Sequence, residues 1–159
     1  MGRPLLILVS CLLAPPLAGQ SGARTVADGP GGAVELGTLR ARAQAGDAAA
    51  QFELGDRCHF GRGVPRDPAE SARWYRMAAE QGHAGAQVNL GNAYFRGEGL
   101  ARNVAEGYVW FALAAVNGQP GAATNRDLAA KKLSVPALRG AQDRVRDLQR
   151  IIPARKGGS

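Results

Sequence analysis

The chain has 159 residues, of which 45% are hydrophobic, 21% charged and only 6% aromatic. This composition excludes a fully disordered chain, and it disfavours a β-sandwich, which is rich in β-branched and aromatic side chains. The net charge of +7 is uneven, because residues 126–159 hold nine Lys or Arg against three Asp, whereas residues 20–125 hold ten bases and ten acids. The length predicts one domain, and the many alanines and glycines favour closely packed helices.

The N-terminal segment has the pattern of a secretory signal peptide. Arg3 precedes a short apolar run from Leu5 to Leu13, and small residues follow a pair of prolines. A charged start, an apolar run and a small-residue exit are the parts of an export signal, and this run is shorter than the ~20 residues of a membrane span. We therefore expect a signal peptide over residues 1–21, a flexible linker over 22–32, and a periplasmic or secreted mature chain without a transmembrane span. A lipoprotein anchor at Cys11 is the alternative.

The region after this segment repeats itself at a fixed offset. Residues 50–55 (Ala-Gln-Phe-Glu-Leu-Gly) recur at 86–91 as Ala-Gln-Val-Asn-Leu-Gly, 36 positions later. The same offset joins the two tryptophans and the Gly-x-Gly segments of both copies. A period of ~20–50 residues is typical of solenoids and related stacked arrays. The predicted repeat domain covers residues 33–151, with a half repeat (33–45), two repeats (46–81 and 82–117), a degenerate C-terminal repeat (118–151) and a flexible tail (152–159).

Each repeat is predicted to be a pair of helices. The first helix covers residues 48–60, and again 84–95, and ends at a Gly-x-Gly turn, since glycine adopts the left-handed conformation that closes a helix. The second helix begins after Asp67 in one copy and after Asn103 in the other, which are good N-cap residues. Glu70 is expected to complete a capping-box-like pair with Asp67. Counting the half repeat and two C-terminal helices (122–133 and 135–151, the latter capped by Ser134), we expect seven helices.

The matched positions of the two copies predict the core. A large side chain that recurs at one place in each second helix is expected to pack against the neighbouring repeat, and the two tryptophans fit this description. The predicted structural core consists of Leu54, Gly55, Trp74, Leu90, Gly91, Tyr94 and Trp110.

These motifs resemble the Sel1-like repeat, a relative of the tetratricopeptide repeat. The resemblance covers roughly residues 34–150, and its motifs are Ala50-Gln51, Leu54-Gly55, Gly61-Arg62-Gly63-Val64, Trp74-Tyr75 and Ala78-Ala79, most of which recur in register. The stretch at 125–129, followed by Leu133-Ser134, is similar to the ending of exported bacterial members. The resemblance implies an all-α, right-handed α-solenoid of antiparallel helix pairs that serves as a scaffold for other proteins, often in the cell envelope.

The analogy with tetratricopeptide grooves places a partner-binding surface on the inner face of the first helices. The candidate residues mix apolar and polar side chains, as surfaces that bind proteins or peptides do. They are Phe52, Asp56, His59, Val88, Asn92, Phe95 and Arg96. The predicted function is that of an exported, non-enzymatic scaffold for protein–protein interaction.

An envelope enzyme that acts on or binds cell-wall material, similar to penicillin-binding members of the family, is an alternative. It would need a convergent group of titratable residues, and the sequence carries no local catalytic motif, so we expect no catalytic residue and no cofactor. Cys58, His59 and His83 offer too few ligands for a zinc site, so we expect no metal. Cys58 would then be either a small buried residue or the site of an intermolecular disulfide.

A second alternative uses the basic C-terminal helix. Its positive charge would attract an anionic lipid or polymer, while the repeats hold another partner. No aromatic residue lies among these bases, so they offer no stacking surface for a single strand, and we expect no nucleic-acid binding.

Overall fold

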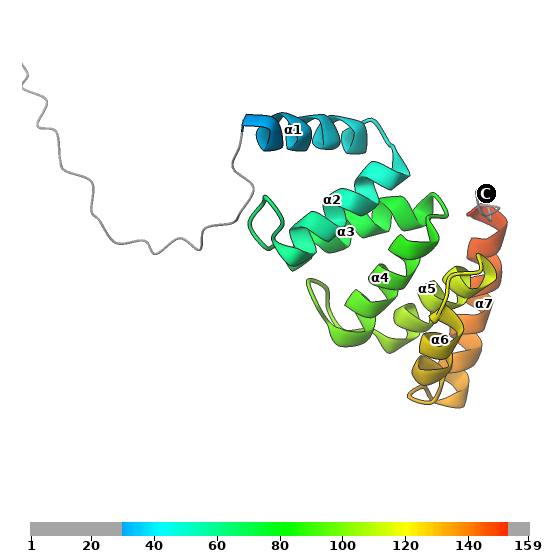
Figure 1. The fold of residues 1–159 in the computed structure, drawn as a ribbon. Coiled ribbons are helices and arrows are strands. Elements are labelled where there is room, and N and C mark those ends of the chain that lie inside the picture. Colours follow the sequence, from blue (N-terminus) through cyan, green and yellow to red (C-terminus); the bar gives the residue numbers. More distant parts are fainter. Residues whose placement is uncertain (1–29, 153–159) are drawn as a thin grey trace, which may run out of the picture.

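The computed structural model describes residues 30–152, and this part of the chain forms seven α-helices and no strand. Successive helices pack against one another from α1 to α6, and α7 lies against α5 (Figure 1). This arrangement confirms the predicted all-α solenoid of helix pairs. The helices are α1 (Pro30–Gln44), α2 (Ala48–Phe60), α3 (Pro68–Glu80), α4 (Ala84–Arg96), α5 (Val104–Val116), α6 (Ala122–Ala130) and α7 (Val135–Ile151).

The ends of the domain differ from the prediction. Helix α1 begins at Pro30, inside the segment expected to be linker, because proline fits the first turn of a helix. Helix α6 ends at Ala130, and the chain turns over the next residues through hydrogen bonds to Ala129 and Ala130 carbonyls. Ile152, expected in the tail, caps α7 and is buried. The predicted signal peptide, most of the linker and the rest of the tail lie outside the described residues.

The predicted caps are present in both repeats. The Asp67 carboxylate accepts hydrogen bonds from the Ala69 and Glu70 amides at 2.9 Å each, and Asn103 caps α5 in the same way. Gly61 and Gly97 end α2 and α4 with φ values of 71° and 78°. The capping-box prediction for Glu70 is wrong, since its carboxylate instead accepts from the Trp74 indole N–H at 3.2 Å.

A glycine of each first helix packs against an aromatic ring of the second. A Cβ placed on Gly55 would lie 2.7 Å from the ring of Tyr75, and one on Gly91 would lie 2.6 Å from that of Phe111. Tyr75 and Phe111 are one repeat apart and both are buried. Only glycine lets the two helices approach this closely, so the pair sets the spacing within each repeat.

The two tryptophans are not equivalent. Trp110 is 3% exposed, whereas Trp74 is half-buried, because it packs on a smaller cluster that includes Leu39 of the single helix α1. The hydrogen bond of the indole also differs. Glu106 is the equivalent of Glu70, but it pairs with Arg144 of α7 at 2.7 Å, and Trp110 Nε1 has no hydrogen-bond partner. Trp74 and Tyr94 both pack against the core but lie at its edge, and Tyr94 is half-buried beneath Arg76.

Buried glutamines join each repeat to the one before it. Gln51 donates to the Ala43 carbonyl at 3.0 Å, and its equivalent Gln87 donates to the Ala79 carbonyl at 3.2 Å. Each also accepts a hydrogen bond, from Gln81 at 2.8 Å and from Asn117 at 3.0 Å respectively. Since buried polar groups are costly without partners, these hydrogen bonds specify the register between neighbouring repeats.

No helix among residues 30–152 has the length and apolar character that crossing a bilayer requires.

We expect Gly91→Ala to destabilise the protein by about 1–3 kcal/mol, because the new methyl group overpacks the buried Phe111 ring. Gly37→Ala is the matched control, since nothing lies within 4 Å of a Cβ at this exposed position of α1. It should stabilise by about 0.5–1 kcal/mol through helix propensity. Urea unfolding followed by circular dichroism measures both, and an equal effect of the two substitutions would refute the close-packing role of Gly91.

Candidate functional site

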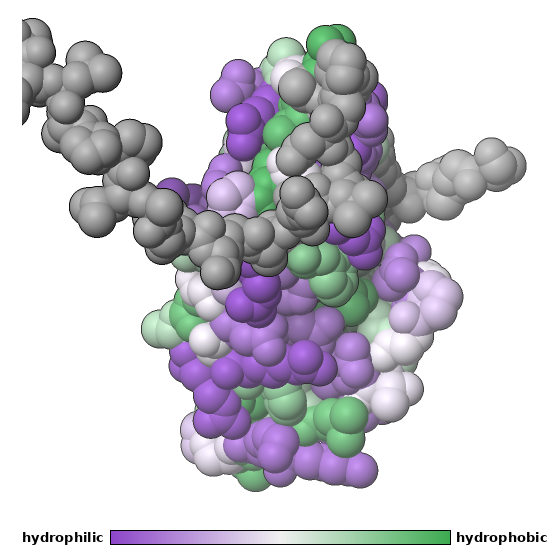
Figure 2. Space-filling model, turned by 60° about the vertical axis from the view of Figure 1, so that its left-hand side comes forward, coloured by the Kyte–Doolittle hydropathy of each residue, from purple (hydrophilic) through white to green (hydrophobic). Residues whose placement is uncertain are grey.

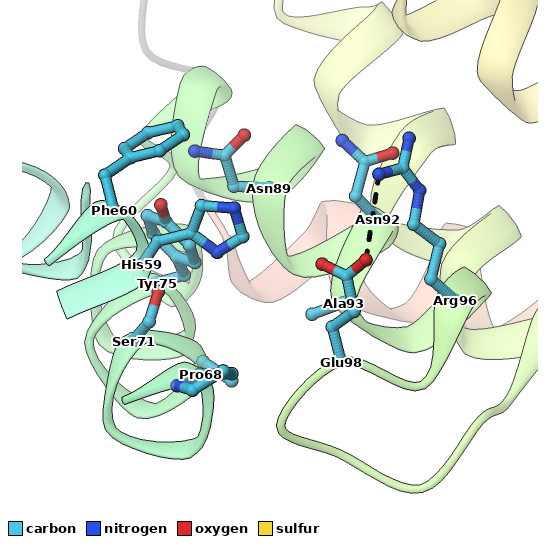
Figure 3. Close-up of a pocket in the computed structure, with 11 residues that line it drawn as sticks. His59, Phe60, Pro68, Ser71, Tyr75, Asn89, Asn92, Ala93, Arg96 and Glu98 are labelled. Carbon is cyan, nitrogen blue, oxygen red and sulfur yellow. Dashed lines mark ion pairs between the residues drawn. The ribbon is translucent and has the colours of Figure 1, made fainter. Parts of the chain in front are cut away.

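Two adjoining pockets form a groove along the first helices. The first pocket, of about 90 Å³, lies between α2, α3 and α4 (Figure 3). The second, of about 130 Å³, lies between α4, α5 and α6. Asn92 and Arg96 of α4 line both, so the pockets adjoin at this helix. The groove residues discussed below are His59, Phe60, Ser71, Tyr75, Asn89, Asn92 and Glu98 in the first pocket, and Asn92, Phe95, Arg96, Asn125 and Leu128 in the second.

The structure brings together four of the seven predicted groove residues: His59, Asn92, Phe95 and Arg96. The other three do not line either pocket. Phe52 stacks on His83 with ring centroids 4.5 Å apart, and Val88 packs against the main core. The Phe52 ring also lies close to Gly85 of α4, so the structure places neither Phe52 nor Val88 in the lining of these two pockets.

Asp56, the third of these residues, lies beneath the first pocket and connects three helices. Its carboxylate accepts from the Tyr75 hydroxyl at 2.6 Å and from the Asn89 side-chain amide at 3.2 Å. Burial raises the pKa of Tyr75, and the hydrogen bond to Asp56 raises this pKa further. The phenol therefore keeps its proton and continues to donate it to Asp56.

The mouth of the first pocket is polar and carries charges of both signs. Arg96 forms an ion pair with Glu98 at 3.7 Å, and the Arg96 side chain is 63% exposed (Figure 3). Phe60, which is 57% exposed, lies edge-on to His59, and the guanidinium of Arg62 covers its ring at 4.6 Å. Hydrophilic side chains also dominate the face of the molecule shown in Figure 2. The groove therefore suits a partner with polar as well as apolar groups.

Of the groove residues named above, sequence reasoning missed Phe60, Ser71, Tyr75, Asn89, Glu98, Asn125 and Leu128. Asn89 and Asn125 are 36 positions apart, so the repeat offset itself was a usable signal for them. Ser71 carried no such signal, because its equivalent is Gly107, where a Cβ would lie only 3.1 Å from the Gly91 carbonyl oxygen. The serine thus marks a difference between the two repeats, which a search for repeated residues overlooks.

The structure describes the surroundings of the residues considered for metal or disulfide chemistry. Cys58 is buried at 2% exposure, and no group of three or more His, Cys, Asp or Glu in the described part of the chain could hold a metal ion. Burial, with smaller contributions from the Glu70 and Asp67 carboxylates, raises the pKa of the Cys58 thiol to about 11. An intermolecular disulfide at Cys58 would therefore require local opening.

Most arginines of the basic helix α7 have acidic partners. Arg144 pairs with Glu106, Arg146 with Asp143, and Arg150 with Asp147. Arg139 is exposed, as are Lys131 and Lys132 just before the helix. These pairs reduce the positive field that α7 presents to an anionic surface.

We expect iodoacetamide to alkylate Cys58 very slowly in the folded protein at about pH 8. A thiol pKa of about 11, compared with the ordinary 9.0, lowers the thiolate fraction about 100-fold, and burial slows access further. Peptide mapping by mass spectrometry measures modification of Cys58 in native protein and in protein unfolded by guanidinium. Equal rates in the two states would show that the thiol is accessible and contradict its burial.

Comparisons with known proteins agree with this architecture. The Sel1 repeat model matches residues 48–83 and 84–119. A protective antigen present in uropathogenic Escherichia coli strains, displaying an SLR fold, is 36% identical with a TM-score of 0.71 over 76% of this chain and 26% of that chain. A Sel1 repeat protein from Oxalobacter formigenes is 33% identical with a TM-score of 0.58 over 58% of this chain and 27% of that chain. This chain thus spans about a quarter of each relative. Among curated proteins, none matches the chain.

Proposed function

Because this chain is a Sel1-repeat protein, we propose that it is an exported, non-enzymatic scaffold that binds a protein or peptide of the cell envelope through the groove. The observation that carries the proposal is that two adjoining pockets together span three successive first helices, α2, α4 and α6. A surface shared by several repeats is what solenoids use to bind extended partners.

The side chains of the groove support binding rather than catalysis. Asp56 is already engaged by Tyr75 and Asn89, and Arg96 is paired with Glu98. These three charged groups are therefore already engaged within the protein, whereas a catalytic site holds an acid, base or nucleophile ready for a substrate. Export, and with it the envelope location of the partner, rests on the pattern of charged, apolar and small residues at the start of the chain.

The groove is tested by a pair of matched double substitutions. Asn92→Arg with Arg96→Glu changes the residues shared by the two pockets, whereas Gln142→Arg with Arg139→Glu makes the same exchanges on the exposed face of α7. Both variants lower the net charge by one, so they differ in position and not in charge. Affinity capture from an envelope extract, with quantitative mass spectrometry, should recover a partner with wild type and the α7 variant, and at least about 10-fold less with the groove variant.

Circular dichroism first establishes that both variants fold. A partner retained equally by the groove variant and lost by the α7 variant would overturn the groove and support attachment through the basic helix. Retention by both would exclude the two surfaces together.

A further inference from the structure

The floor of the first pocket contains a buried hydroxyl without a partner. Ser71 is 1% exposed, and its Oγ has no partner with full hydrogen-bond geometry, although the Tyr75 hydroxyl lies close to it. Ser71 lines the pocket together with His59, Tyr75 and Asn92 (Figure 3). Buried polar groups nearly always have hydrogen-bond partners, so an orphaned hydroxyl beside a cavity points to a polar ligand group.

The neighbouring side chains offer mainly oxygen atoms to such a ligand. Asp56 takes the proton of the Tyr75 hydroxyl and one amide hydrogen of Asn89, so the phenol oxygen and the Asn89 carbonyl oxygen can only accept. Asn92 makes no side-chain hydrogen bond that would fix its amide orientation, and Glu98 brings a carboxylate to the mouth. Lysine is the side chain that carries three donors and no acceptor.

The negative charge bonded to the inner residues of the pocket also favours a cationic group over an anionic one. The Asp56 carboxylate bonds to Tyr75 and Asn89. Glu98 lies at the mouth with the guanidinium groups of Arg96 and Arg62. The acceptors come from α2, α3 and α4 and so surround the pocket, which suits the diverging N–H bonds of an ammonium. A guanidinium has a planar fork that pairs best with two oxygens of one carboxylate.

The walls of the pocket fit the remainder of a lysine side chain. Pro68, Ala72 and Ala93 line it between the mouth and the floor groups. A lysine buries its methylene stem on apolar surface of this kind and directs its charged tip to polar groups.

We propose that the first pocket binds a primary ammonium group at the end of an unbranched alkyl chain, such as a lysine side chain of the partner. The proposal rests on the groove being the partner-binding surface. A free diamine carries the same chemistry, so the test includes both sources.

The test is a titration of the isotope-labelled full chain followed by amide chemical shifts. The compounds are Nα-acetyl-lysine N-methylamide, its Nε-acetylated form, which has no charge, and cadaverine. We expect saturable shifts at Ser71, Asn92 and Glu98 with the lysine compound and none with the acetylated form. Ser71→Ala and Glu98→Gln should each weaken binding at least about 3-fold, whereas Glu80→Gln, an exposed position of α3 outside the pocket, should not.

Ser71→Ala also separates binding from folding, because removal of an orphaned hydroxyl should leave the unfolding midpoint unchanged or raise it. Tighter binding of cadaverine than of the lysine compound would support the ammonium pocket and identify a free diamine as its ligand. No saturable shift with either amine, equal shifts with the acetylated form, or binding unaffected by Ser71→Ala and Glu98→Gln would overturn the proposal. If the groove variant still loses its captured partner in that case, the scaffold function stands and only the lysine pocket fails.

Discussion

The hydrogen bonds of two buried glutamines are the constraint on which the array depends. Gln51 and Gln87 each donate a hydrogen bond to a carbonyl near the end of the preceding second helix. Each also accepts one from the last part of its own repeat, Gln51 from Gln81 and Gln87 from Asn117. Alanine-rich helices have smooth surfaces and pack in several registers with similar energy. A buried amide, by contrast, is satisfied in one register only. The position of α4 relative to α2, and therefore the width of the groove, follows from that register.

The groove itself arises from differences between the repeats. The glycine–aromatic contact is common to both and sets the helix spacing within each. At one equivalent position, however, the first repeat has Ser71 and the second has Gly107, and only the first leaves a hydroxyl beside a cavity. The C-terminal helix adds another difference, because Arg144 takes the carboxylate of Glu106 that would otherwise accept from Trp110. Shared residues thus maintain the scaffold, and the unshared ones determine its binding chemistry.

Local signals in the sequence predicted the helices well. Caps such as Asp67 and turn glycines such as Gly61 act within a few residues, so their effect is readable from the chain alone. Side-chain directions across helices were harder to predict. Trp74 lies at the edge of the core, while its neighbour Tyr75 packs on the glycine, and Phe52, expected in the groove, stacks on His83. These outcomes depend on how helices distant in sequence are rotated against each other, which periodicity alone does not define.

A double-mutant cycle between Gln87 and Asn117 tests the central claim most directly. Gln87→Leu and Asn117→Ala are measured singly and together by urea unfolding, with Gln81→Ala in place of Asn117→Ala as the control, since Gln81 pairs with Gln51 instead. The account predicts a coupling energy of about 0.5–3 kcal/mol for Gln87 with Asn117, and a value near zero for Gln87 with Gln81. Equal couplings in the two cycles, or none in the first, would show that Asn117 does not hold the buried Gln87 amide in the position from which it reaches the Ala79 carbonyl.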